Sequence, residues 1–562
     1  MAFTEDLNRV LSGERLSIND EELVPGTVHL VDVENILHVQ KDGSGNIILQ
    51  PQPLDNVNDP LRWSKTKKNA QFTLLFVWAF FLAVTVNWSG PFWTEWTEEF
   101  NCTFTQLNIS SALCFLFLGL GCVFLQPTAM KLGRRFVYLT CTILAIIANA
   151  IGIHANSVQY LYASNIIAGF AAAPVDSLVE ISSTDVFFTH ERASKLSWLI
   201  LALYFGSDIG PVVAGYLPSW QWAFKLQVII LCVMFALQLF LMEDTTFSRE
   251  EKHTEEDILE QIRSRDVVLS AVQSGVVSEK DEKVKHIISE RNSTEEERED
   301  PLVGSKRSYW KRMQLMELEF NERRSWLTIF YRPLLMAPLP AIIWGGIVYG
   351  SQMMWLSLLA TTQSEIYSTY YSFSTSSTGL TNLAPLGGSI LGMAYGGWFV
   401  DWLSIKLAKR NKGILEPEFR LWAMIFPTLI NAAGLLAYGL ASVNRKPWPI
   451  SVILGQGFLG FAMSATGPIS LTYAIECYPN MASEGLVLML FVRNMIGCGF
   501  TFAIQPWLDR DGLTTTTWLM FMLSVICNGG FVIFLVWGKK FRRMTKDYYY
   551  KISDKNFGAL SF

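Results

Sequence analysis

Long segments without a charged residue recur along the whole chain, and they constrain the fold more than any other feature. Residues 72–87 and 138–153 contain no Asp, Glu, Lys or Arg, and only 17% of all residues are charged. With their flanks such segments reach about 20 residues, the length of a helix that crosses about 30 Å of hydrocarbon. Helices of soluble domains keep a polar face, which these segments lack. The sequence therefore predicts an all-α membrane protein.

Twelve such segments are expected, in two sets of six. The first set lies near residues 70–88, 108–126, 136–155, 159–181, 197–217 and 222–242, and the second near residues 334–359, 375–400, 421–441, 449–471, 486–507 and 515–537. The predicted parts are an N-terminal tail (1–68), a six-helix bundle (69–242), a polar linker (243–330), a second six-helix bundle (331–538) and a C-terminal tail (539–562). Two similar bundles that rock about a site at the middle of the membrane are typical of secondary transporters.

The distribution of Lys and Arg near the segment ends predicts the orientation in the membrane. Nineteen lie on the side of the N-terminus and three on the other side. Since cytosolic loops are enriched in these residues, both termini and the linker are expected in the cytosol. The first external loop then holds a glycosylation sequon at Asn101. Its glutamates form either an ordinary acidic loop or a negative funnel that attracts cations.

Composition and motifs narrow the classes of function. The net charge is -5 and no basic stripe covers an ordered region, so no nucleic-acid partner is expected. Most of the eight cysteines lie in apolar segments, where a thiol acts as a small apolar group, and this disfavours a disulfide framework. The sequence shows neither a nucleotide-binding loop nor a metal-ligand spacing. We expect no cofactor, no metal and no enzymatic activity, and an ion gradient as the energy source.

The loop between the second and third segments ends in Gly133-Arg134-Arg135. This ending resembles the signature of the major facilitator superfamily, in which an acidic residue three positions before the glycine pairs with basic partners and holds one conformation. Met130 stands at that position here, so the resemblance does not carry the charge latch over. The corresponding loop of the second half keeps Gly397 and Asp401, and a conformational gate is expected there.

The fifth segment contains Gly206, Asp208, Gly210 and Pro211, in a string similar to the glycine-proline signature of the antiporter branch of this superfamily. Small residues let helices approach closely, and a proline disturbs the helical hydrogen bonds, so a bend is expected. Four further strings, at residues 58–64, 185–190, 411–421 and 476–479, resemble the fungal drug:proton antiporter group and, within it, fungal permeases of histidinol and polyamines. One departure is Asn165, where that group usually has an arginine.

Carboxylates within the membrane are the main candidates for the site, because they are costly there. Asp176 and Glu180 lie one turn apart and share a helix face, and Asp176 is the predicted principal contact of a cation. Asp208 is a second candidate that could exchange a proton for a cation. Glu476, at the end of its segment, serves either a gate or binding. Arg493 and Lys225 are the exceptions to a scarcity of basic residues, so the cavity suits a cation better than an anion.

Three aromatic residues of the seventh segment, Trp344, Tyr349 and Trp355, could cage an ammonium group by cation–π attraction, or could serve only for packing. The resemblance implies a proton-coupled transporter of organic cations, with polyamines and related amines as substrates. It is expected to work as a monomer in the fungal plasma membrane. Two alternatives stay open: an efflux pump for drugs or fungal metabolites, and a nutrient sensor that moves no solute. Import or export, and symport or antiport, also stay open.

Overall fold

The computed structural model describes residues 59–187, 189–245, 309–316, 325–411 and 414–553, together with Pro25 and Val28–His29. Within these residues ten helical segments are long and apolar enough to cross a membrane. One of them, Pro479–Met544, contains two spanning helices, and the shorter apolar helix Trp198–Ala214 is a further one. The predicted all-α fold is therefore confirmed, with twelve spanning helices.

The first bundle contains six spanning helices and two short ones. They are α2 (Lys65–Asn87), α3 (Trp93–Glu99), α4 (Phe104–Leu132), α5 (Arg134–Ile153), α6 (Val158–Asp176), its continuation α7 (Leu178–Val186), α8 (Thr189–Ala214) and α9 (Trp220–Leu241). Single turns at η1 (Pro60–Arg62) and η2 (Gly90–Phe92) flank α2. Two short helices, α12 (Tyr309–Arg312) and α13 (Trp326–Tyr331), belong to the linker.

The second bundle contains more breaks within its helices. It begins with η3 (Arg332–Met336) and continues with α14 (Pro340–Tyr371), α15 (Thr375–Thr381), α16 (Leu383–Ala394), η4 (Tyr395–Phe399) and α17 (Val400–Arg410). There follow η5 (Pro417–Met424), α18 (Ile425–Val443), η6 (Ile450–Gln456), α19 (Gly457–Cys477), η7 (Pro479–Met481), α20 (Ala482–Gly529), α21 (Phe531–Met544) and α22 (Lys546–Ser553).

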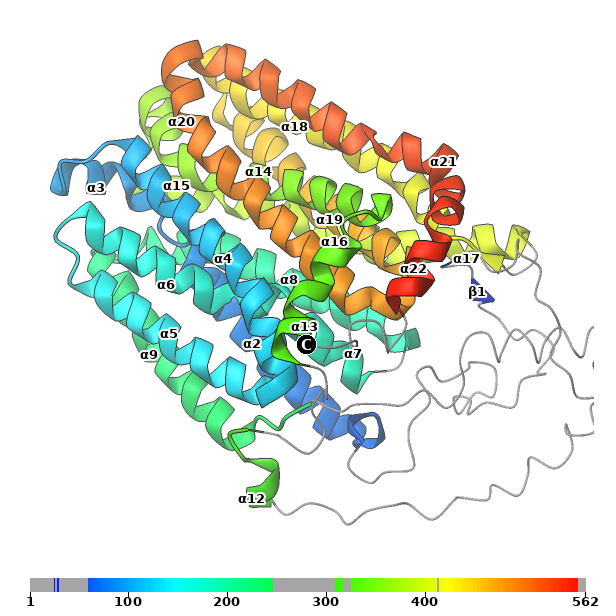
Figure 1. The fold of residues 1–562 in the computed structure, drawn as a ribbon. Coiled ribbons are helices and arrows are strands. Elements are labelled where there is room, and N and C mark those ends of the chain that lie inside the picture. Colours follow the sequence, from blue (N-terminus) through cyan, green and yellow to red (C-terminus); the bar gives the residue numbers. More distant parts are fainter. Residues whose placement is uncertain are drawn as a thin grey trace, which may run out of the picture.

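The two bundles lie side by side, the first coloured blue to green and the second light green to red in Figure 1. They touch mainly through α4 against α20 and α8 against α16. We call the end of the bundles that carries α3 the α3 end, and the opposite end, which carries α13 and α22, the linker end. A cavity between the bundles is thus framed by helices that come from distant parts of the sequence.

Two glycines mark places where the chain turns in a way that other residues resist. Gly133 ends α4 with φ 93°, and Gly512 has φ 72° inside α20, where the eleventh and twelfth spanning helices meet. Side chains other than that of glycine rarely tolerate positive φ. A tight turn at Gly133 therefore fits the Gly-Arg-Arg string that follows α4.

Close contact between α4 and α20 depends on Gly119. A Cβ atom at this position would lie 2.7 Å from Cε of Met495 and 3.0 Å from Cβ of Asn494. In α8 the tightest approach is at Gly206, where a Cβ atom would lie 2.3 Å from the carbonyl oxygen of Phe80. At Gly210 the nearest atom would be 3.3 Å away, so this glycine leaves more room than Gly206 does.

The C-terminal segment is packed against the second bundle at the linker end. The sequence predicted a tail from residue 539, whereas α21 runs on to Met544 and α22 follows it. Tyr549 and Ile552 of α22 are buried, and Arg542 of α21 pairs with Glu418 of η5 at 2.6 Å. The carbonyl oxygen of Pro25 accepts a hydrogen bond from Arg542, and the strands β1 (Val28–His29) and β2 (Ile414–Leu415) pair antiparallel beside it.

Candidate transport site

A cavity of about 60 Å³ lies between the two bundles. The helices α2, α4, α6 and α8 line it from the first bundle, and α14 and α20 line it from the second. Its walls are apolar apart from seven polar or charged side chains, which are Asn87, Asp176, Tyr204, Ser207, Tyr349, Gln352 and Arg493. A mostly apolar pocket with a few convergent polar groups is typical of a small-molecule site.

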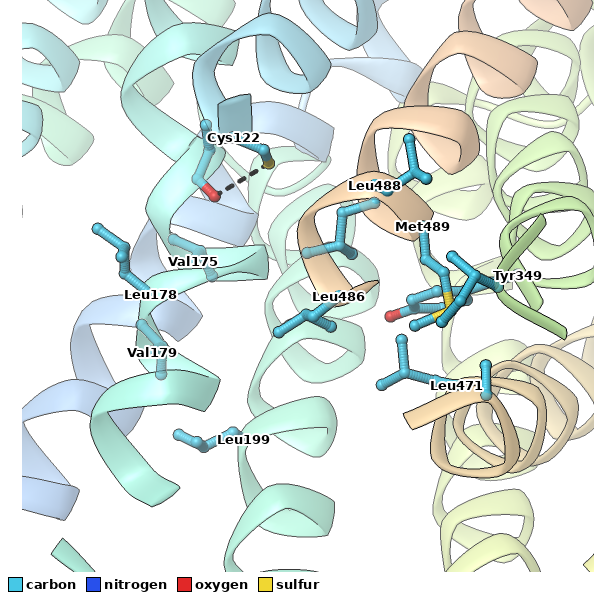
Figure 2. Close-up of a cluster of buried hydrophobic side chains, with 14 of the residues drawn as sticks. Cys122, Val175, Leu178, Val179, Leu199, Tyr349, Leu471, Leu486, Leu488 and Met489 are labelled. Atoms are coloured by element: carbon cyan, nitrogen blue, oxygen red, sulfur yellow. Dashed lines mark hydrogen bonds between the residues drawn. The ribbon is translucent and has the colours of Figure 1, made fainter. Parts of the chain in front are cut away.

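The apolar packing beside the cavity is formed by both bundles. In Figure 2, Val175 and Leu178 of the first bundle lie on one side, and Leu486 and Met489 of the second lie on the other. Tyr349 lies beside Met489 in the same view. Because these side chains are buried, the charged groups at the cavity are surrounded by a medium of low polarity, in which charge interactions are strong.

An ion pair crosses the cavity from one bundle to the other. Nη1 of Arg493, on α20, lies 3.2 Å from Oδ1 of Asp176, at the end of α6, and both side chains are less than a tenth exposed. The guanidinium also lies over the ring of Tyr349, 4.5 Å from its centroid. Of the three aromatic residues predicted for a cation cage, Tyr349 therefore lies at the cavity and already holds a cation.

The ion pair is not fully satisfied by hydrogen bonds. Oδ2 of Asp176 is buried and has no hydrogen-bond partner among the described residues, and Nη2 of Arg493 reaches only the sulfur of Met353, at 3.5 Å. Buried ion pairs compensate for lost hydration only when their remaining hydrogen-bonding positions are filled. The cavity thus presents an acceptor that is ready for a further donor.

Two more carboxylates are buried in the first bundle. Glu180 lies one turn beyond Asp176, on α7, and interacts electrostatically with Asp176 and Arg493. Asp208, on α8, is buried, and its Oδ2 has no hydrogen-bond partner in the part of the chain that the structure describes. Its neighbour Ser207 lines the cavity, whereas Asp208 does not.

The other two aromatic candidates lie away from the cavity. Trp344 stacks on Phe534, with ring centroids 4.6 Å apart, and Trp355 packs edge to face with Phe500 at 5.9 Å. Neither ring lines the cavity between the bundles. In this conformation both tryptophans pack within the second bundle.

The residues predicted to gate the transporter form ion pairs at the linker end. Arg134 lies 2.5 Å from Asp185, which follows the fourth spanning helix. In the second half Arg420 pairs with both Asp401, at 2.6 Å, and Glu476, at 2.8 Å. Glu476 therefore lies in an ion pair at the linker end and not at the cavity.

Two of the remaining gating candidates, Arg135 and Gly397, lie near these ion pairs along the chain, whereas Pro211 lies toward the α3 end, beside α15. Arg135 is buried and donates hydrogen bonds to the carbonyl oxygens of Leu239 and Gln314, at 2.7 and 2.8 Å, so it ties α9 to the linker. Gly397 lies in η4, directly before α17 with its Asp401. Pro211 lies inside α8, which continues to Ala214.

At the α3 end the bundles are joined by direct hydrogen bonds. The hydroxyl groups of Thr94 and Ser364 lie 2.7 Å apart, and Thr375 donates to Glu95 at 2.9 Å. Deeper in the same interface, Asn108 donates to Gln505 at 3.2 Å. These contacts hold the two bundles together on the α3 side of the cavity.

The sequence alone did not predict the ion pair of Arg493 with Asp176 or the polar lining of the cavity by Asn87, Ser207 and Gln352. A charged residue inside an apolar segment was the available signal for Arg493, because such a residue needs a partner. Its partner Asp176 lies more than 300 residues earlier in the chain, and only the approach of the two bundles, through α4 against α20, brings the two together.

Comparisons with known proteins agree with this architecture. The family model of the Major Facilitator Superfamily matches residues 75–501. An uncharacterized MFS-type transporter of Schizosaccharomyces pombe is 29% identical, with 94% of each chain covered. Protein HOL1 of Saccharomyces cerevisiae is 28% identical, over 94% of this chain and 97% of its own length.

Among solved structures, the proton:xylose symporter XylE has a TM-score of 0.55 at 13% identity, over 84% of this chain and 97% of the symporter, a likeness of fold alone. The family model spans well over half of the chain, and the two fungal relatives align with this chain over almost its whole length. This chain belongs to the Major Facilitator Superfamily, and it is a multi-pass membrane transporter and not an enzyme.

Proposed function

We propose that this transporter carries organic cations, with polyamines and related amines as substrates, and that a proton gradient drives it. The observation that carries the proposal is the Asp176 carboxylate, which lies at the cavity between the bundles with one buried oxygen that no described residue supplies with a hydrogen bond. An ammonium group is the donor that such an oxygen accepts best, because hydrogen bonds between charged groups are the strong ones.

The balance of charge near the cavity supports a cation. Asp176 and Glu180 contribute two carboxylates against the single guanidinium of Arg493, and Asp208 adds a third carboxylate on the neighbouring helix α8. Residues one turn apart on a helix have Cβ atoms about 5–6 Å apart. Asp176 lines the cavity and Glu180 does not, so Asp176 is the proposed contact of one ammonium group of a polyamine, with Glu180 as the nearby second carboxylate.

Asp208 is the proposed proton carrier. An ionised carboxylate without a partner is costly in an apolar environment, so a buried carboxylate is stable when it holds a proton or meets a cation. Asp208 lies next to Ser207, which lines the cavity and accepts a hydrogen bond from Asn87 at 3.1 Å. Rearrangement of α8 against α2 would expose Asp208 to water, and proton exchange would follow.

The location and orientation of the protein are part of the same proposal. The bias of Lys and Arg toward one side supports cytosolic termini and a cytosolic linker. The α3 end would then face outward, with the exposed Asn101 as a glycan acceptor, and the protein would work as a monomer in the plasma membrane. The glycine-proline string of α8, with Gly206, Gly210 and Pro211, favours export as the alternative direction of transport.

The proposal is tested with the purified protein in proteoliposomes. Labelled spermidine is supplied outside, with and without a pH gradient in either direction, and vesicles without protein serve as the blank. We expect uptake by the protein-containing vesicles that changes several-fold with the sign of the gradient. Uptake that does not depend on the pH gradient would refute proton coupling. If the protein supports neither uptake nor efflux from loaded vesicles, cation transport is refuted.

A further inference from the structure

Arg493 is the one residue of the second bundle that pairs with Asp176 among the described residues. The contact joins α20 to α6, and the two helices belong to bundles that must move relative to one another in any transporter of this architecture. An ion pair that crosses the moving interface at the cavity itself differs from the ion pairs at the linker end. Arg134–Asp185, for example, joins two residues of the first bundle.

The guanidinium occupies the position that a substrate cation would need. It lies at ion-pair distance from the Asp176 carboxylate and over the Tyr349 ring, which are the carboxylate and the aromatic face that an ammonium group would also use. The fit of the guanidinium is incomplete, because neither its Nη1 nor Oδ2 of Asp176 has a hydrogen-bond partner within the described part of the chain. A buried pair held so loosely can be exchanged for a better-bonded cation.

We propose that Arg493 is an internal competitor for the cation site, and that substrate binds by displacing its guanidinium from Asp176. This inference rests on the proposed transport of organic cations. In the empty transporter Arg493 neutralises Asp176 and ties the two bundles together across the cavity. When an ammonium group takes its place, the tie through Arg493 opens, and Glu180, which already attracts the guanidinium, helps to balance its charge.

The inference predicts an effect on affinity that other roles of Arg493 do not share. A site that is occupied by its own side chain binds substrate with an affinity lowered in proportion to the fraction of free sites. Removing the positive charge of Arg493 should therefore tighten the binding of a cation. If Arg493 instead anchored an acidic group of the substrate, or served only to hold the fold, the same change would weaken binding or leave it unaltered.

The test measures equilibrium binding of labelled spermidine to the purified, detergent-solubilised protein. We expect Arg493→Gln to lower the dissociation constant by about tenfold or more, which corresponds to about 1.4 kcal/mol. Arg493→Lys keeps the charge and should bind with nearly the affinity of the wild type. Arg510→Gln is the matched control, because this residue lies on the same long helix, α20, with its side chain 88% exposed.

The outcomes separate this inference from the proposed function. If Arg493→Gln weakens spermidine binding or leaves it unchanged, the inference that Arg493 competes with substrate is overturned. The proposed transport of cations is unaffected by that result. Equal tightening in Arg493→Lys and Arg493→Gln would also overturn the inference, because the charge would then not matter. A wild-type protein that neither binds nor moves spermidine would overturn the proposed function, and the inference with it.

Discussion

Replacing Arg542 with methionine should destabilise the fold strongly. This side chain is almost fully buried and donates two hydrogen bonds to Glu418, at 3.0 and 2.6 Å, and one to the carbonyl oxygen of Pro25, at 2.6 Å. Arg542→Met keeps much of the apolar stem and leaves Glu418 as a buried charge that has lost its guanidinium. Breaking a buried ion pair in this way costs about 3–5 kcal/mol.

The double variant Arg542→Met/Glu418→Leu should lose less than the single variant, since no charge is left uncompensated. Thermal unfolding in detergent can be followed with a thiol-reactive fluorophore in a Cys232→Ser/Cys527→Ser background, because these two thiols are exposed or partly exposed whereas Cys477, in the same bundle as Arg542, is fully buried. The exposed Arg510→Gln is the control, with an expected change below about 1 kcal/mol. An Arg542→Met protein as stable as this control, or a double variant less stable than the single one, would refute the reasoning.

Three further outcomes are expected. The double variant Thr94→Cys/Ser364→Cys should form a disulfide under mild oxidation, since the two hydroxyls lie 2.7 Å apart at the α3 end. The disulfide should stop transport, and a reductant should restore transport. Transport by the cross-linked protein would show that this end need not open. Asp176→Asn should weaken spermidine binding by tenfold or more, a loss of about 1.4 kcal/mol or more, whereas Asp208→Asn should bind normally and transport without regard to the pH gradient; the reverse pattern would exchange their roles. Asn101→Gln should abolish the mobility shift that a glycosidase produces on the protein from a fungal host; a shift that survives Asn101→Gln and Asn108→Gln but is lost in Asn292→Gln, the sequon of the linker, would contradict the proposed orientation.

The spanning helices could be predicted because the signal for a membrane helix lies within its own run of apolar residues. A run of apolar residues such as 138–153 needs no distant partner to be recognised, and the breaks fall at polar loops. The family could likewise be identified from short strings around Gly133 and Pro211. The structure and the family match confirm both predictions.

The helical packing of the C-terminal segment escaped prediction for a physical reason. Residues 539–553 mix Lys and Arg with several tyrosines, a composition that reads as a polar tail. The burial of Arg542 in this segment depends on Glu418, which lies over 100 residues earlier and pairs with it. A local reading of charge cannot show that a charge is paired.

The candidate site could be predicted in part. The carboxylates of α6, α7 and α8 are visible in the sequence because charge is rare inside apolar segments. Helical spacing alone does not tell which face of α14 meets the cavity, so it did not distinguish Tyr349 from Trp344 and Trp355. The pairing of Asp176 with Arg493 depends on the contact of two bundles, which no spacing within either helix encodes.

The most direct measurement is an experimental structure of the full-length protein in complex with spermidine. We predict density for the ligand in the cavity between the bundles, with an amine nitrogen at hydrogen-bonding distance from the Asp176 carboxylate and the Arg493 guanidinium moved away from it. Density for spermidine elsewhere in the protein, with the Asp176–Arg493 ion pair intact at 3.2 Å, would contradict this account of the cation site.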